Sequence, residues 1–418
     1  MDRIYICIDL KSFYASVECV ERGLDPFTTN LVVADPSRGN GALCLAVSPN
    51  MKRLGVKNRC RIFDIPKGID YITALPKMKH YIEVSSNIYA VYLKYISPKD
   101  IHVYSIDECF IDLTTYLNLY HKTAKEIAQM LIDDVMRTTG IPATCGIGTN
   151  LFLAKIALDI MAKKAPDFIG YLDIDEFKKS IWHHEPITDI WNIGPGIAKR
   201  LTKYGAYNLY DVTKIDEKKL YKEFGVNAEF LIDHAWGREP CTIEEIQNYK
   251  SKAHSISNSQ ILFEDYNYQD AYLIMKEMIE LNVLELVDKH LVTNSIYIGV
   301  GYSKNTINPT GGSMKLSGYT NSYKELNEYC LSLFEKTTDR CNPIRRIGIG
   351  FGNVISDEYQ SINLFTDVKS LESEKKVQEA ILSIKHKYGK NAVFKGMNLE
   401  EKATTLKRNK LIGGHNGE

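Results

Sequence analysis

The sequence predicts an α+β protein that is divided into several domains. At 418 residues the chain is too long for one ordinary hydrophobic core. From the N-terminus to about residue 357, short apolar runs with strand character alternate with segments of helical periodicity. This alternation fits antiparallel sheets that are backed by helices.

The composition excludes some classes of protein and leaves others open. Hydrophobic residues make up 44% of the chain and charged residues 25%, as in ordinary globular proteins. No apolar stretch approaches the ~20 residues of a membrane span, and the N-terminus lacks the pattern of a secretory signal, so we expect a cytoplasmic protein without membrane association. The net charge of zero leaves nucleic-acid binding open, because a local basic track is sufficient for it.

The nine cysteines are scattered and form no C-x-x-C pair. Several lie in apolar runs, which indicates buried thiols in a reducing compartment and argues against a zinc site.

Three carboxylates lie within strand-like apolar runs near the start of the chain. Asp9 closes one run, whereas Asp107 and Glu108 interrupt the run from Ile101 to Ile111. Buried carboxylates cost free energy unless they are neutralised, and two divalent cations roughly 3.5–4 Å apart would neutralise them. The alternative is a helix N-cap or a solvated hairpin turn, the more frequent role of an isolated Asp-Glu pair.

Local signals place these carboxylates among helices and strands. Ser12 is a candidate N-cap for a helix that Gly23 ends, and Asn150 is a candidate cap for a helix from Leu151 to Lys164. Further strands are expected at 31–34, 42–47 and 144–148, and further helices at 50–55, 83–98 and 123–139.

Three separated motifs resemble those of the Y-family (translesion) DNA polymerases. They are the run from Asp9 to Glu18, the run Ser105-Ile106-Asp107-Glu108, and Ala154–Ala157 followed by Met161–Lys164. The resemblance covers roughly residues 1–360, and the segment from Ala403 to His415 is similar to the tail of the UmuC-like (UmuC/ImpB/MucB) branch in Gram-positive bacteria.

The resemblance implies a right-hand polymerase with a palm, small fingers, a helix-hairpin-helix thumb and a little-finger domain. It implies these bounds: palm 1–11 and 80–168, fingers 12–79, thumb 169–240, linker 241–252, little finger 253–358, and a C-terminal tail 359–418.

The resemblance also implies template-directed addition of dNTPs to a primer 3′-hydroxyl in DNA repair, damage tolerance and the SOS response. In the family the carboxylates matching Asp9, Asp107 and Glu108 bind two Mg²⁺ ions, and the backbone carbonyl of Leu10 would be a further ligand. The expected partners are primer-template DNA and dNTPs, and the enzyme is expected to be monomeric.

Nucleotide contacts follow from the same motifs. Lys52 matches a basic residue of the fingers, and Lys163 matches the basic residue that ends the third motif. A one-residue length difference leaves Lys164 as the alternative. Many members have Tyr three residues before the fingers cation; Pro49 stands there, and Ser48 could compensate weakly.

The aromatic pair Phe13-Tyr14 resembles the family's steric gate. Tyr14 would lie under the sugar C2′ and exclude a ribose 2′-hydroxyl, with Phe13 packed beneath it. Without the family context, both would be read as core aromatics at a helix start.

Two regions are candidates for DNA binding. Gly194 and Gly196 permit a tight turn whose amides can approach a phosphate, and Lys199 and Arg200 follow on the next helix. Candidate cations of the little finger are Arg345 and Arg346.

The segment Gln360–Phe365 resembles the peptide that docks bacterial polymerases onto the sliding clamp. Gln360 would enter a polar slot, and Leu364 and Phe365 an apolar pocket. The spacing departs by one residue, since Ser361 stands where the usual peptide has Gln. The alternatives are a last strand edge or a linker.

Two other functions compete with a polymerase. A nuclease or nucleotide cyclase could use the same carboxylates, and a DNA-binding subunit without activity could retain the fold. The thumb hairpin, the Tyr14 gate and the intact carboxylates argue against both.

Overall fold

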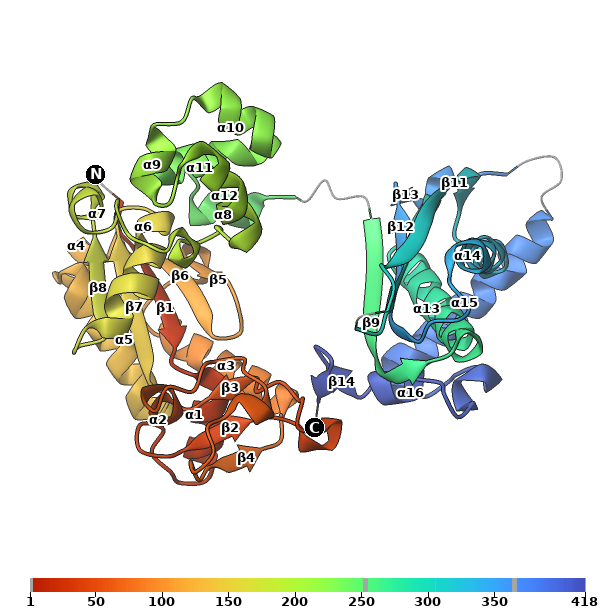
Figure 1. Cartoon of the computed structure of the whole chain (residues 1–418), viewed down its shortest axis with the longest axis horizontal. Coiled ribbons are helices and arrows are strands. Elements are labelled where there is room, and N and C mark those ends of the chain that lie inside the picture. Colours follow the sequence, from red (N-terminus) through yellow and green to blue (C-terminus); the bar gives the residue numbers. More distant parts are fainter. Residues whose placement is uncertain (1–2, 251–254, 305, 363–366, 418) are drawn as a thin grey trace. The chain divides into compact units, whose positions relative to one another are not determined.

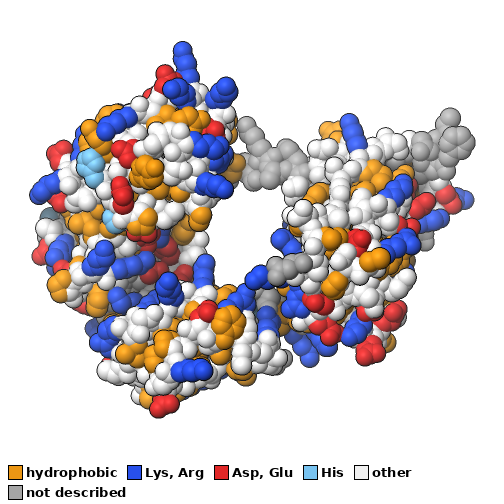
Figure 2. All heavy atoms as spheres, viewed as in Figure 1, with side chains coloured by type: hydrophobic (Ala, Val, Ile, Leu, Met, Phe, Trp, Pro, Cys, Tyr) orange, Lys and Arg blue, Asp and Glu red, His pale blue; other side chains and the backbone are white. Residues whose placement is uncertain are grey.

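This computed structural model describes residues 3–250, 255–304, 306–362 and 367–417 (Figure 1). Contacts divide the chain into two compact units, residues 1–250 with 416–418 and residues 251–415. Across the described ranges, no helix is long and apolar enough to cross a membrane. Lysine and arginine side chains are interspersed with acidic ones on the visible faces of both units (Figure 2).

The first unit is built on a five-stranded sheet in the order β5-β6-β1-β7-β8. Strand β1 is antiparallel to both of its neighbours, whereas β7 and β8 are parallel. The strand bounds are Tyr5–Leu10 for β1, Ile101–Val103 for β5, Glu108–Asp112 for β6, Ala143–Gly148 for β7 and Ile169–Leu172 for β8.

Helices pack against this sheet. Tyr5 and Cys7 of β1 share a buried cluster with Leu151, Ala154 and Leu158, which belong to the helical segment that begins with α6. Because side chains alternate along a strand, Asp9 lies on the same face as Tyr5 and Cys7. The helices around the sheet are α3 (Met78–Tyr92), α4 (Tyr116–Tyr120), α5 (Ala124–Thr139) and α6 (Leu151–Ile156).

The helical segment after β7 is not regular along its length. Asn150 accepts a hydrogen bond from the Leu153 amide, as its predicted capping role requires. Beyond α6 the chain forms a π-helical turn at Ala157–Met161 and a 3-10 turn at Ala162–Lys164. A π turn accommodates one additional residue in a helix, so it changes the register of the residues that follow, Lys163 and Lys164 among them.

The fingers region contains a small sheet in the order β3-β2-β4, with β2 antiparallel to β3 and parallel to β4. The strand expected at 42–47 is reduced to β3, and Ser12 has a φ of 51° and forms no side-chain cap, contrary to its predicted role. The elements are α1 (Phe13–Glu21), β2 (Leu31–Val33), β3 (Ala46–Val47), α2 (Pro49–Arg53) and β4 (Ile72–Ala74).

Helices α7 to α12 complete the first unit. Helix α12 occupies half of the expected linker 241–252. Its Ile243 is 2% exposed and joins the cluster of Tyr5, while Gln247 Nε2 donates to the Ile101 carbonyl at 3.0 Å. The interpretation of this stretch as a weakly apolar connector is therefore wrong for α12. The bounds are α7 Ile174–Ser180, α8 Pro195–Leu201, α9 Leu209–Thr213, α10 Glu217–Phe224, α11 Ala228–Ala235 and α12 Ile243–Asn248.

The second unit contains a sheet in the order β11-β10-β12-β9 with α13 and α14 packed against it. Strand β11 was not predicted, because its Gly- and Ser-rich sequence lacks strand character. The bounds are β9 Ser255–Tyr266, α13 Tyr268–Asp288, β10 Leu291–Tyr302, β11 Thr310–Thr320, α14 Tyr323–Thr337, β12 Ile344–Gly352 and β13 Ile355–Ser356.

The expected tail is packed onto the second unit for much of its length. Glu277 of α13 is 1% exposed and accepts hydrogen bonds from Asn398 Nδ2 and the Thr404 amide, both at 2.8 Å, and from the Thr405 amide at 3.2 Å. These donors satisfy a buried carboxylate, so this part of the chain belongs to the domain core. The elements are α15 (Val368–Tyr388), α16 (Thr405–Arg408), β14 (Leu411–Ile412) and β15 (His415–Asn416).

The close contact between β7 and α6 gives a stability prediction. A Cβ on Gly148 would lie 2.2 Å from the Ala154 amide nitrogen, so Gly148→Ala must push the helix from the sheet. We expect urea denaturation to show a loss of about 2–3 kcal/mol. Gly41→Ala is the control, because its Cβ would meet no atom within 4 Å. Equal stability of both variants would contradict this packing.

Candidate active site

The pairing of β1 with β6 brings the predicted carboxylates together. Asp9 and Glu108 are direct cross-strand partners, and the Leu10 amide donates to the Asp107 carbonyl at 2.8 Å. Side chains directly opposite each other in an antiparallel pair lie on one face, with Cβ atoms about 4.5–5.5 Å apart. The fold therefore places two like charges side by side.

A buried lysine compensates one of these charges. Lys155 Nζ lies 2.8 and 2.9 Å from the two carboxylate oxygens of Glu108, and Cys7 Sγ donates to Glu108 Oε1 at 3.0 Å. Burial, the largest single influence, lowers the pKa of Lys155, but Glu108, Cys7 and Asp159 together outweigh it, so this pKa is raised. Lys155 was part of a predicted motif, but its role as the partner of Glu108 was not predicted.

Lys155 extends the ion pair into a network. It also lies 3.0 Å from Asp159 Oδ2, and Lys163 Nζ lies 2.8 Å from Asp159 Oδ1. The network therefore connects Glu108 with the lysine that ends the third motif.

The negative charge of Asp9 is compensated less than that of Glu108. Burial raises the pKa of Asp9 to about 7; the nearby Lys163 lowers it, and Asp107 and Glu108 raise it further. Among the described residues, none donates a hydrogen bond to its carboxylate. A half-buried carboxylate with this surplus of negative charge favours a bound cation.

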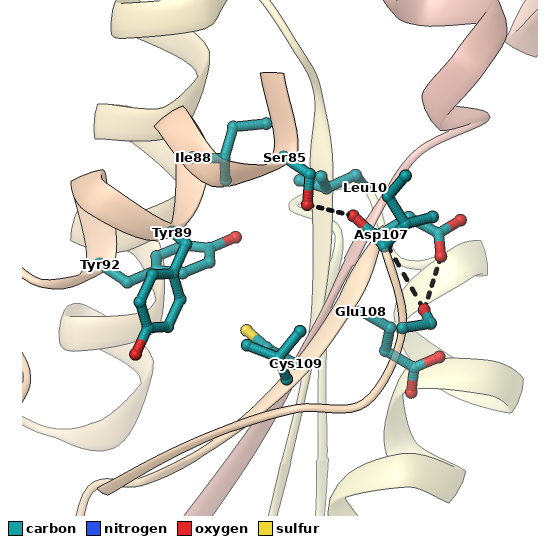
Figure 3. Close-up of a pocket in the computed structure, with 11 residues that line it drawn as sticks. Leu10, Ser85, Ile88, Tyr89, Tyr92, Asp107, Glu108 and Cys109 are labelled. Carbon is teal, nitrogen blue, oxygen red and sulfur yellow. Dashed lines mark hydrogen bonds between the residues drawn. The ribbon is translucent and has the colours of Figure 1, made fainter. Parts of the chain in front are cut away.

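The Asp107 side chain is held by a hydrogen bond to Ser105. Its Oδ1 accepts a hydrogen bond from Ser105 Oγ at 2.7 Å, and Figure 3 shows its carboxylate separated from that of Glu108. In the part of the chain that the structure describes, no three His, Cys, Asp or Glu side chains are grouped closely enough to hold a metal ion. The hard oxygen donors fit a divalent cation chemically, but Asp107 and Glu108 are turned toward Ser105 and Lys155.

Helix α3 contacts the turn that carries Asp107. A small pocket is lined by Leu10, Asp107 and Glu108 and by Ile88 and Tyr92 of α3 (Figure 3). Ser85 of the same helix donates to the Ile106 carbonyl at 2.6 Å. The turn is thus fixed to the palm on this side.

Lysines surround the carboxylates. Lys52 as a residue is exposed, but loss of water around its ammonium group lowers its pKa. The charge of Asp9 raises this pKa and the charge of Lys163 lowers it, so the three groups form one electrostatic cluster. Lys11, which was not predicted, joins this cluster and lies 4.2 Å above the Phe168 ring. Lys163 rather than Lys164 is the cation that acts on Asp9.

Ser48 does not present its hydroxyl to a ligand. The residue is fully buried, and its Oγ donates to the Thr29 carbonyl at 2.7 Å and caps α2 by accepting from the Met51 amide at 3.3 Å. The prediction that Ser48 contacts a triphosphate is therefore wrong, since the hydroxyl is used by the fold.

Tyr14 packs on a residue that sequence reasoning missed. Its ring stacks on Tyr81 with centroids 4.6 Å apart and an interplanar angle of 18°, whereas Phe13 is 2% exposed and tilted by 47°. The ring beneath Tyr14 is thus Tyr81 and not Phe13. The Tyr81 hydroxyl donates to the buried Glu18 at 2.8 Å, which fixes the supporting ring.

The turn of the thumb hairpin lies where it was predicted, but an asparagine rather than a glycine has the positive φ. The residue in the left-handed region is Asn192, with a φ of 67°, whereas Gly194 has a φ of −81°. A Cβ on Gly194 or Gly196 would meet no atom within 4 Å, so these glycines leave open space at the start of α8. Lys199 is exposed there, whereas the Arg200 guanidinium lies 4.3 Å from the Phe224 ring.

One face of the sheet in the second unit is covered by helices, and the other carries small residues around Tyr297. Tyr297 is 55% exposed. Arg346 is exposed on β12 and pairs with Gly301, whereas Arg345 lies at the strand irregularity and forms an ion pair of 3.5 Å with Asp265. The small residues around Tyr297 are Gly350, Gly348, Gly299, Ser257, Ser259 and Ser313.

The start of the expected clamp peptide is docked on the same unit. The Ser361 amide donates to the Tyr319 carbonyl, and the Tyr319 amide to Ser361 Oγ, both at 2.8 Å. Gln360 precedes this contact, whereas Leu364 and Phe365 lie outside the described residues.

Comparison with known proteins agrees with this architecture. The profile of the impB/mucB/samB family matches residues 8–159, and that of its C-terminal domain matches residues 253–364. The putative UV-damage repair protein UvrX of Bacillus subtilis is 30% identical over 98% of this chain and 97% of its own length. The chain belongs to the impB/mucB/samB family. The predicted family is confirmed.

A further relative and a solved structure align over most of the chain. DNA polymerase IV 2 of Halalkalibacterium halodurans is 29% identical over 99% of this chain and all of its own length. A Y-family DNA polymerase chimera of known structure superposes with a TM-score of 0.64 at 22% identity, covering 84% of this chain and 99% of that one. The predicted α+β fold of the Y-family polymerases is confirmed.

The electrostatics of Asp9 give a pH prediction. Because its folded pKa of about 7 exceeds the ordinary 3.8, the folded state binds its proton more tightly, and stability falls as pH rises through this interval. Without divalent cations, Asp9→Asn should gain on the order of 1–2 kcal/mol at about pH 8, with the gain disappearing near pH 4.

Chemical denaturation at the two pH values measures this difference. Asp133→Asn, an exposed change on α5, should show no such pH dependence. An Asp9→Asn variant that is no more stable than the native chain at the higher pH would contradict the electrostatic description.

Proposed function

We propose that this chain is a template-directed DNA polymerase of the translesion type, which adds dNTPs to a primer 3′-hydroxyl. The observation that carries this proposal is the pairing of Asp9 with Glu108 next to Asp107, with Lys52 and Lys163 in the same electrostatic cluster. Relatives named DNA polymerase IV align along almost the entire chain, which supports the same reaction.

Divalent cations are the cofactor that this chemistry requires. Asp9, Asp107 and Glu108 would hold two Mg²⁺ ions, with the Leu10 carbonyl as a further ligand. When bound, such ions would supply charge that lowers the pKa of the primer hydroxyl and offsets the charge of the leaving pyrophosphate. Lys155 would hold the Glu108 side chain in the sheet through its ion pair of 2.8 Å.

The remaining positive charges would bind the triphosphate. Lys52 on α2 and Lys163 after the π turn lie on different elements and both act on Asp9. Two cations from different sides can hold the phosphates in line for displacement, since positioning and charge stabilisation supply most of the catalysis in phosphoryl transfer. Tyr14, which is supported by Tyr81, would lie under the sugar.

Binding of primer-template DNA would use two surfaces. The open start of α8, with Gly194, Gly196 and Lys199, lets phosphates approach backbone amides. The small-residue face of the second unit's sheet, with Arg346, lets a nucleic-acid backbone approach closely, and Arg345 would contribute only after leaving Asp265.

Recruitment to a sliding clamp by Gln360, Leu364 and Phe365 remains part of the proposal. The docking of Ser361 on Tyr319 supports it, because this contact anchors one end of the peptide to a folded domain. A tether of this kind would raise the effective concentration of the primer end. We also propose that the enzyme acts as a monomer in the cytoplasm.

The first test of the function is primer extension. Asp107→Asn should lower extension with Mg²⁺ by about 100-fold or more, because it removes a ligand for charge that develops in the transition state. Its affinity for primer-template DNA should stay within about twofold, since the change leaves Lys199, Arg346 and the other groups proposed to contact DNA phosphates in place.

Asp133→Asn is the matched control and should extend primers normally. A nuclease would degrade the primer rather than lengthen it, and a binding subunit would do neither. If Asp107→Asn extends primers at the native rate, the assignment of the catalytic carboxylates is wrong.

The second test concerns sugar selection. Tyr14→Ala should admit ribonucleotides and reduce discrimination by at least about tenfold, because removal of the ring opens space beside C2′. Tyr14→Phe keeps the ring on Tyr81 and should keep the discrimination. Single-nucleotide insertion with dNTPs and rNTPs measures both. Unchanged discrimination in Tyr14→Ala would place the gate elsewhere.

A further inference from the structure

Trp191 contacts the turn that carries the catalytic carboxylates. Its Nε1 donates to the Tyr104 hydroxyl at 3.1 Å, and the two rings meet edge to face with centroids 5.9 Å apart. The amides of Tyr104 and Ser105 both donate to the Glu108 carbonyl at 3.0 Å. Tyr104 is thus the first residue of the closed turn that ends at Glu108.

Trp191 also belongs to the thumb. It immediately precedes Asn192, the left-handed residue of the hairpin, and lies three positions before Gly194, which caps α8. Its ring packs against two buried clusters, the palm cluster with Tyr5 and Phe110 and the thumb cluster with Ile190, Ile193 and Leu201. One side chain therefore joins the two parts of the unit.

Aromatic stacking continues this contact into the palm. The Trp191 ring lies nearly parallel to His234, with centroids 6.0 Å apart and an angle of 18°. His234 in turn stacks on Phe152 of α6 at 4.1 Å and 13°. Trp191 is therefore held on one side by a buried stack, while its indole N–H reaches the catalytic turn on the other.

The exposure of the pair argues against a purely space-filling role. Tyr104 is 46% exposed, and Trp191 is only half-buried, so the hydrogen bond between them is formed where water could replace it. A core filler needs no such bond. A hydrogen bond between two rigid aromatic side chains does fix direction, because each ring has few rotatable bonds.

We propose that Trp191 and Tyr104 are positioning residues that link the DNA-contacting hairpin of the thumb to the turn of Asp107 and Glu108. The inference rests on the proposed function, because it assumes that these carboxylates perform the chemistry and that the hairpin contacts DNA. When the hairpin engages the duplex, Trp191 holds the catalytic turn in its productive position. Small errors in such positions are costly, since displacements of about 1 Å can reduce rates by 10²-fold.

The test compares Trp191→Phe, Tyr104→Phe and the double variant in the full chain. Each change keeps an aromatic ring and removes one side of the hydrogen bond. We expect each to lower the maximal rate of single-nucleotide insertion by about 3- to 10-fold, with KM for dNTP and Kd for DNA within about twofold. The double variant should be no slower than the slower single variant, because both remove the same link.

Trp182→Phe is the matched control. Trp182 Nε1 donates to the Ala235 carbonyl at 2.7 Å within the thumb, so this variant also loses an indole hydrogen bond but none to the catalytic turn. Its insertion rate should be native. An equal loss of rate in this control, a native rate in Trp191→Phe, or additive losses in the double variant would each overturn the inference.

The outcomes separate this inference from the proposed function. If the native chain does not extend primers at all, the proposed function is wrong, and the inference about Trp191 and Tyr104 is wrong with it. If the native chain extends primers and Trp191→Phe matches it in rate, the inference alone fails. A rise in KM or Kd with an unchanged maximal rate would assign Trp191 to DNA or nucleotide binding, which also contradicts a positioning role.

Discussion

The antiparallel pairing of β1 with β6 places the carboxylates of Asp9 and Glu108 directly opposite each other on a partly buried face. Two like charges at that spacing destabilise a sheet, so the surrounding structure must compensate them. Lys155 compensates Glu108 through two contacts below 3 Å, whereas Asp9 keeps a pKa near 7. The site thus has one neutralised and one unsatisfied carboxylate.

The helical segment after β7 makes this compensation possible. Gly146 and Gly148 let α6 approach β7 so closely that any Cβ there would overlap with the helix backbone. This approach brings Lys155 to Glu108, and the π turn that follows keeps Lys163 beside Asp159 and within reach of Asp9. Packing of small residues is therefore what determines the charge distribution of the site.

Much of this architecture could be predicted, because it follows from local signals. Asp9, Asp107 and Glu108 stand at strand ends within three ordered motifs, and Asn150 caps its helix through a bond three residues away. Helix α5, which has strong periodicity, formed within one residue of its expected bounds, 123–139.

The features that were missed depend on partners far away in the sequence. Tyr81 supports Tyr14 from 67 positions along the chain in a stacked pair, and Lys155 finds Glu108 across 47 positions. Strand β11 has a Gly- and Ser-rich sequence, and only its pairing with β10 makes it a strand. Ser48 was misassigned because its hydroxyl is satisfied by Thr29 and Met51, contacts that no motif contains.

The central claim, that the carboxylates of β1 and β6 form a divalent-cation site, is tested most directly by Mn²⁺ binding. Electron paramagnetic resonance can count the ions held by the native chain, Asp9→Asn and Glu108→Gln with primer-template DNA and a non-hydrolysable dNTP analogue. We expect two tightly bound ions in the native complex and a loss of at least one in each variant. Equal numbers of bound ions in the native chain and both variants would contradict it.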